Sequence, residues 1–168
     1  NAFSYSGAFS VYALAGGARL VHSVDSSRKA CAWAEENVRM NFPGISPHET
    51  RVADAFDFIR QAGAGYDMII LDPPAFAKHL SGINQAATGY GNLNREAMRA
   101  IRKNGILFTF SCSQVVDRKL FRQIIFSSAQ QAGRNVRILH QIFQPADHPV
   151  SVFHPESEYL KGLVLHVE

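Results

Sequence analysis

The sequence predicts an α/β fold built on a mostly parallel β-sheet, and three observations support it. Short apolar runs typical of buried strands alternate with longer segments of helical periodicity. The 168 residues are enough for one domain with its own core. Hydrophobic residues make up 46% of the chain and charged residues 18%, as in folded globular proteins. We therefore expect one domain, residues 1–168, with helices on both faces of the sheet.

The first half of the chain contains three predicted strands. The clearest is 66-YDMIILD-72, because its apolar run ends at two prolines. The helix after the first of these strands has Ser26 or Ser27 as its N-cap. A helix also follows the opening loop 4-SYSG-7. The other strands are expected at residues 18–25 and 49–54, and the helices between strands at 27–41 and 55–62.

The second half begins with a predicted loop over residues 78–91, which contain several Gly, Asn and Ser. A helix over 93–103 is expected to stop at 104-NG-105. Because a loop without helical periodicity joins the last two strands, the last strand is expected to be antiparallel. The remaining elements are a strand at 106–111, a helix at 117–132, and strands at 136–143 and 160–168.

Composition excludes several classes of protein. The formal charge of +3 allows a nucleic-acid partner without requiring one. The two cysteines, Cys31 and Cys112, form neither a disulfide framework nor a CxxC zinc motif, which favours a reducing, cytoplasmic setting. No apolar run is long enough for a membrane span, and no metal site is expected. The abrupt opening 1-NAFSYSG-7 suggests that an N-terminal portion is missing.

Acidic residues end three successive predicted strands, at the sheet edge where ligands bind in such folds. Asp25 is placed equally well to bind two ribose hydroxyls or to cap the next helix. Asp54 could accept from an adenine amino group, although an N-cap role is favoured. Gly7 in the loop 4-SYSG-7 permits a close backbone approach, but the loop lacks the GxGxxG pattern of dinucleotide binding.

The third acidic residue begins a more specific segment, 72-DPPAF-76. Two prolines stiffen the turn and remove two backbone donors, which suits the amino group and face of a flat base. Phe76 is equally well explained as a stacking partner for that base or as a core aromatic. Cys112 ends the strand in 107-LFTFSCSQ-114, where it is either inert packing or a nucleophile. Cys31 is expected to be inert core packing.

Taken together, these residues resemble the class I S-adenosylmethionine-dependent methyltransferases, and more closely the large-subunit ribosomal RNA cytosine-C5 methyltransferase family. The resemblance rests on stretches that keep their order and approximate spacing over nearly the whole chain. They are 3-FSYSGAFS-10, 24-VDSS-27, 35-EENVRMN-41, 72-DPPAF-76, 108-FTFSCS-113, 146-ADHPV-150 and 159-YLKG-162.

The resemblance implies a Rossmann-like sheet of seven strands with an antiparallel last strand, of which the first strand is truncated here. It implies Cys112 as the catalytic nucleophile and Asp72 beside the methyl donor and the target base. It also implies that the PUA domain and intervening domain of the family are absent from this chain. The implied S-adenosylmethionine-binding residues are Phe3, Ser4, Tyr5, Ser6, Gly7, Asp25, Ser26, Asp54, Ala55 and Asp72.

The implied partner is RNA, most specifically large-subunit rRNA, with a homodimer left open. Residues expected to contact the target nucleotide are Pro73, Pro74, Phe76 and Lys78. Candidate phosphate contacts are Lys78, His79, Arg95, Arg118, Lys119, Arg122 and Lys161, although a solvated helix face also explains those at 118–122. The rival interpretations are a methyltransferase acting on a nucleobase nitrogen, which needs no thiol, and a non-catalytic cofactor-binding module.

Overall fold

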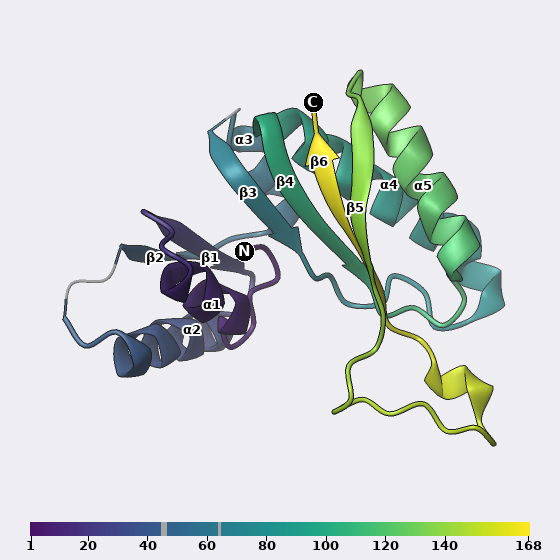
Figure 1. Cartoon of the computed structure of the whole chain (residues 1–168), viewed down its shortest axis with the longest axis horizontal. Coiled ribbons are helices and arrows are strands. Elements are labelled where there is room, and N and C mark those ends of the chain that lie inside the picture. The colour runs from purple at the N-terminus through teal and green to yellow at the C-terminus, as the bar shows by residue number, and fades with distance from the viewer. Residues whose placement is uncertain (45–46, 64) are drawn as a thin grey trace. The chain divides into compact units, whose positions relative to one another are not determined.

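The computed structural model describes residues 1–44, 47–63 and 65–168, which form two compact units (Figure 1). The first unit comprises Asn1–Gln61 and Ile70–Asp72, and the second comprises Ala62–Ile69 and Pro73–Glu168. Strand β3 (Tyr66–Leu71) is therefore divided between them. Among the described residues, no helix combines the length and apolarity needed to cross a membrane.

The first unit is built around two parallel strands, β1 and β2, which pair from Val21 opposite His48 to Asp25 opposite Val52. Ser27 caps the second helix by accepting from the amide of Ala30 at 3.2 Å, as the sequence predicts. The first two helices pack against each other and against β1. The elements are α1 (Ala8–Ala15), β1 (Val21–Asp25), α2 (Arg28–Asn41), β2 (His48–Val52) and α3 (Ala55–Gln61).

The first strand of the expected sheet is reduced to a single residue, Ala2. Its amide donates to the carbonyl of Ile70 at 2.9 Å, and it forms parallel bridges with Val24 and Leu71. In the described residues, strand pairing gives a two-stranded sheet, β1-β2, and a four-stranded sheet, β3-β4-β6-β5. The last three of these strands are β4 (Ile101–Ser111), β6 (Lys161–Val167) and β5 (Val136–Ile142). The single seven-stranded sheet that the resemblance implies is therefore not seen.

The second unit contains β4, β6, β5 and the beginning of β3, together with two long helices, α4 and α5, which lie side by side (Figure 1). Strand β6 is antiparallel to both of its neighbours, β4 and β5, which confirms the predicted direction of the last strand. Consequently β4 and β5 run in the same direction. The elements are η1 (Leu80–Gly82), α4 (Ile83–Ala100), β4 (Ile101–Ser111), α5 (Arg118–Ala132), β5 (Val136–Ile142), η2 (Pro155–Ser157) and β6 (Lys161–Val167).

The predicted loop over residues 78–91 is wrong, because α4 already begins at Ile83. Its Gly and Asn residues have low helix propensity, but buried side chains recur at helical spacing and supply the packing that holds the helix. They are Ala86, Tyr90, Leu93, Asn94, Ala97 and Met98.

The predicted helix over 93–103 is also too long, since β4 begins at Ile101 directly after α4. The signal that predicted a helix stop, 104-NG-105, lies inside this strand, where Asn104 has a φ of 64°. An Asn-Gly pair tolerates such left-handed backbone in a distorted strand as readily as at the end of a helix.

We expect Gly91→Ala to stabilise the protein by about 0.5–1 kcal/mol, because alanine costs less than glycine inside a helix. A Cβ at Gly91 would meet only ordinary contacts, 3.9 Å from Ile124 and 4.0 Å from Ser128. Gly89→Ala is the matched control, since its Cβ would lie 3.0 Å from the Phe76 ring and the crowding offsets the gain. Urea unfolding measures both, and an equal gain in the two variants would contradict this packing.

Candidate functional site

The loop before α1 has an unusual backbone. Phe3, Tyr5 and Gly7 have φ values of 59°, 44° and 76°, so two residues with side chains adopt the left-handed conformation. A Cβ at Gly7 would lie 2.7 Å from the Cβ of Ala34 in α2, so only glycine fits there. Gly7 therefore allows a close approach between this loop and α2, and the close approach of a ligand to the loop stays a prediction.

Asp25, at the end of β1, holds this loop and the start of α2. One carboxylate oxygen accepts from the amide of Tyr5 at 3.0 Å, and the other accepts from the amide of Ser27 at 2.9 Å. The side chain is half-buried. Because each carboxylate oxygen has a second acceptor site, these bonds leave capacity for two ligand hydroxyls.

Asn37 in α2 also fixes the loop, since its amide donates to the carbonyl of Ser6 at 2.8 Å. The sequence gives no role to this residue, although it lies in the stretch 35-EENVRMN-41 that carries part of the family resemblance. A helical asparagine aimed at a distant carbonyl has no local pattern that identifies it.

Asp54, after β2, is the N-cap of α3, because its carboxylate accepts from the amide of Asp57 at 3.0 Å. This is the role that the sequence favours. The next residue, Ala55, is buried, and the ring of Phe56 meets the ring of Phe3 edge to face, with 6.3 Å between centroids. The first unit thus places two aromatic rings and a carboxylate beside the loop.

These groups fit the methionine and adenosine parts of S-adenosylmethionine. The hydroxyl of Ser4 is buried without a hydrogen-bond partner among the described residues, and a bound ligand can supply that partner. No side chain caps the start of α1 at Gly7, which leaves an N-terminus suited to a carboxylate. Ser26, next to Asp25, is exposed.

The second unit holds the thiol. Cys112 directly follows β4, is half-buried, and donates a long hydrogen bond from Sγ to the carbonyl of Pro73 at 3.8 Å. Ser113 fixes the same turn, since its hydroxyl donates to the carbonyl of Ala77 at 2.8 Å. The turn that carries Cys112 is therefore bonded to Pro73 and Ala77 of the same unit. Asp72, which belongs to the first unit, is exposed.

The other cysteine, Cys31, is buried in α2 with 3% of its surface exposed, which agrees with the predicted core packing. Burial raises the pKa of its thiol, so its reactive thiolate form is disfavoured. The two thiols of the chain thus lie in different environments, and Cys112 is the more accessible of them.

Among the residues expected to contact the target nucleotide, Pro74 and Lys78 are exposed and Pro73 is buried. The ring of Phe76 is half-buried and packs on Tyr90 of α4, with 4.5 Å between centroids. This contact agrees with the core alternative for Phe76, and because the ring is only half-buried, its contact with a base stays a prediction.

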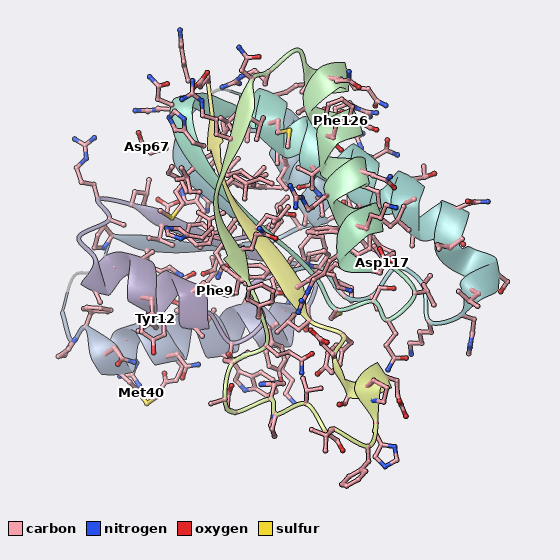
Figure 2. All side chains as sticks on the ribbon, turned by 45° about the vertical axis from the view of Figure 1, so that its right-hand side comes forward. Phe9, Tyr12, Met40, Asp67, Asp117 and Phe126 are labelled. Carbon is pink, nitrogen blue, oxygen red and sulfur yellow. The ribbon has the colours of Figure 1, made fainter. Side chains whose placement is uncertain are left out.

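Basic side chains gather on α5, where Arg118, Lys119 and Arg122 line an open groove with Phe126, the residue labelled on this helix in Figure 2. Lys161 does not belong to such a surface. It is buried, and its ammonium donates to the carbonyls of Ser113, at 2.6 Å, and of Val116. Its prediction as a phosphate contact is wrong, because no phosphate can reach an ammonium enclosed in this way.

Within the described ranges, no group of three or more His, Cys, Asp and Glu side chains could hold a metal ion.

Comparisons with known proteins agree with this chemistry. A family model described as S-adenosylmethionine-dependent methyltransferase matches residues 1–95. Large subunit ribosomal RNA methyltransferase I of Cronobacter sakazakii is 42% identical over 99% of this chain, and that of Tolumonas auensis is 40% identical over 98%. The chain spans only 43% and 42% of the length of these two relatives.

A solved structure, SMU.776 complexed with SAH, superposes on 99% of this chain and 44% of its own with a TM-score of 0.85 and 28% identity. This similarity confirms the α/β methyltransferase fold. The family model covers more than half of the sequence. The chain belongs to the S-adenosylmethionine-dependent methyltransferase family.

Proposed function

We propose that the protein methylates C5 of a cytosine in large-subunit rRNA and that Cys112 forms a transient covalent bond with the base. The observation that carries the proposal is the half-buried thiol of Cys112, held at the end of β4 against the carbonyl of Pro73. Sequence similarity also supports the proposal, because the relatives from Cronobacter and Tolumonas are large-subunit rRNA methyltransferases.

In this mechanism the thiolate of Cys112 adds to C6 of the cytosine, which makes C5 an enamine-like carbon nucleophile. S-adenosylmethionine supplies the electrophilic methyl group. C5 would form a bond to that methyl group as the bond between methyl and sulfonium sulfur breaks, which leaves S-adenosylhomocysteine. C5 would then lose its proton to a general base, and the electrons of the C5–H bond would expel the thiolate from C6. Cys112 is thus regenerated, and the cytosine carries a methyl group at C5 in place of the hydrogen.

Asp72 and the segment after it are proposed to bind the target base. The carboxylate of Asp72 would hydrogen-bond the N3 and N4 edge of cytosine while C6 is attacked. Pro73 and Pro74 would hold that edge rigidly, and Phe76 and Lys78 would contact the nucleotide. A stacked or paired cytosine must first be flipped out, at a cost of roughly a few kcal/mol.

Residues of the first unit are proposed to hold the cofactor. Asp25 would bind the ribose hydroxyls with its remaining acceptor sites, and Asp54 would accept from the adenine amino group. Ser26 and Ala55, which follow these carboxylates, would line the adenosine. The methionine part would lie against Phe3, Ser4, Tyr5, Ser6 and Gly7.

We propose that both units belong to one catalytic domain, residues 1–168, because the family model extends from the first unit into the second. The groove over α5 would contact RNA phosphates through Arg118, Lys119 and Arg122. An rRNA substrate implies action in the cytoplasm. A homodimer is compatible with this proposal and is not required by it.

Cys112→Ala is expected to reduce methyl transfer to large-subunit rRNA by roughly a thousandfold or more, because the nucleophile is lost. Calorimetric titration should show unchanged affinity for S-adenosylmethionine. Mass analysis of digested RNA identifies the product. Methylation of a base nitrogen by an active Cys112→Ala variant would overturn the C5 mechanism and support the nitrogen-methylating alternative.

RNA carrying 5-fluorocytosine at the target tests the covalent bond directly. Fluorine cannot leave as a proton, so a stable adduct at Cys112 should accumulate and be found by peptide mass mapping. Absence of the adduct in protein that binds the cofactor would count against Cys112 as the nucleophile. Protein that binds the cofactor but methylates no RNA would instead favour a non-catalytic module.

Asp54→Asn separates the two roles of Asp54. An amide oxygen can still cap α3, so stability should be retained, while the amide NH₂ replaces the acceptor facing the adenine. We expect S-adenosylmethionine to bind about tenfold more weakly, the value of roughly one hydrogen bond. Asp57→Asn, an exposed residue of the same helix, is the control and should leave binding unchanged. Unaltered binding by Asp54→Asn would remove Asp54 from the cofactor site.

A further inference from the structure

Lys161 occupies the first position of β6 and is buried, with 6% of its surface exposed. An ammonium withdrawn from water is costly unless it is paired or hydrogen-bonded. Here Nζ donates to the carbonyl of Ser113 at 2.6 Å and to that of Val116. Both acceptors belong to the turn after β4, and Ser113 is the residue next to Cys112.

The surroundings of this ammonium contain one thiol and two charged groups. Cys112, after β4, interacts electrostatically with Lys161, as does Asp117. Asp117 lies at the start of α5 and is labelled in Figure 2. Arg118, the next residue of α5, opposes them with a positive charge. Asp117 already caps α5 through the amide of Leu120 at 2.7 Å, and Arg118 is paired with Glu158. Cys112 is thus the neighbour that is neutral as a thiol and becomes an anion only when it loses its proton.

A neutral amine has enough N–H donors for the two carbonyls, so those hydrogen bonds do not require a positive charge. A charge is useful beside a group that becomes an anion. Burial lowers the pKa of Lys161 to about 8, while the thiol of Cys112 and Asp117 act in the opposite direction. The amine therefore remains largely protonated at neutral pH.

We propose that Lys161 is a positioning residue for Cys112, whose ammonium fixes the turn that carries the thiol and stabilises its thiolate form. The inference rests on the proposed function, in which that thiolate attacks the base. The proton of the thiol leaves to water, Lys161 keeps its own proton, and an ammonium–thiolate pair remains. The head group acts on Cys112 through charge.

Lys161→Met should raise the pH at which Cys112 becomes reactive by about one unit, because the neighbouring positive charge is lost. The rate of alkylation of Cys112 by iodoacetamide, followed by peptide mass mapping between pH 5 and 10, measures this midpoint. At pH 7 the rate should fall about tenfold. Lys103→Met, an exposed lysine in β4, is the matched control and should leave the midpoint unchanged.

An unchanged midpoint in folded Lys161→Met protein would overturn the proposal. Cys31 is an internal reference in each sample, since its buried thiol should stay slow while the protein is folded. Alkylation needs no RNA and no methyl transfer. The two ideas can therefore fail separately. If Lys161→Met shows the expected rise in the midpoint while Cys112→Ala still methylates RNA, the proposed function is overturned and the coupling between Lys161 and Cys112 stands.

A second measurement does not depend on the folding of Lys161→Met. The interaction between two titrating groups is reciprocal, so removal of the thiolate must also affect the amine. In protein labelled with ¹³C at lysine Cε, the resonance that titrates near pH 8 should titrate at lower pH in Cys112→Ser than in the unaltered chain. Identical titration in the two proteins would contradict the coupling.

Discussion

The second unit depends on the position of β6, which is inserted between β4 and β5 and pairs with both. Its register sets Lys161 opposite Ser111, the last residue of β4. Gly162 lets the Phe110 ring pack closely, since a Cβ there would lie 2.5 Å from it. The pairing that completes the sheet therefore also brings a buried ammonium to the turn that carries Cys112.

In the proposed cofactor site, the carboxylates of the first unit would combine a capping role with a ligand-binding role. Asp25 accepts from two backbone amides and Asp54 from one, and these bonds hold the loop and the helix starts in place. A carboxylate fixed in this way keeps further acceptor sites at a defined position, at no later cost in side-chain entropy. Under the proposed function, the same hydrogen bonds would both support the backbone and prepare the carboxylates for a ligand.

The sequence predicted those elements whose local signals agree with their packing. The helix α2 has an apolar periodicity and a capping serine, Ser27, and α5 has the equivalent cap at Asp117. The beginning of α4 was missed because Gly89 and Gly91 have low helix propensity, and only contacts with distant segments reveal that the helix forms there. The same holds for Asn37, whose partner at Ser6 lies 31 positions away.

The role of Lys161 was missed for a different reason, since charge alone does not distinguish it from the basic residues of α5. Arg118 and Lys119 begin an amphipathic helix and face water, whereas Lys161 begins the almost wholly apolar run 161-KGLVLHV-167. A strand paired on both edges encloses the stem of a lysine at its start, so the head group must find acceptors within the protein. The acceptors next to β6 are the carbonyls of the turn after β4. When that turn also carries a thiol, the buried charge and the thiol can no longer ionise independently.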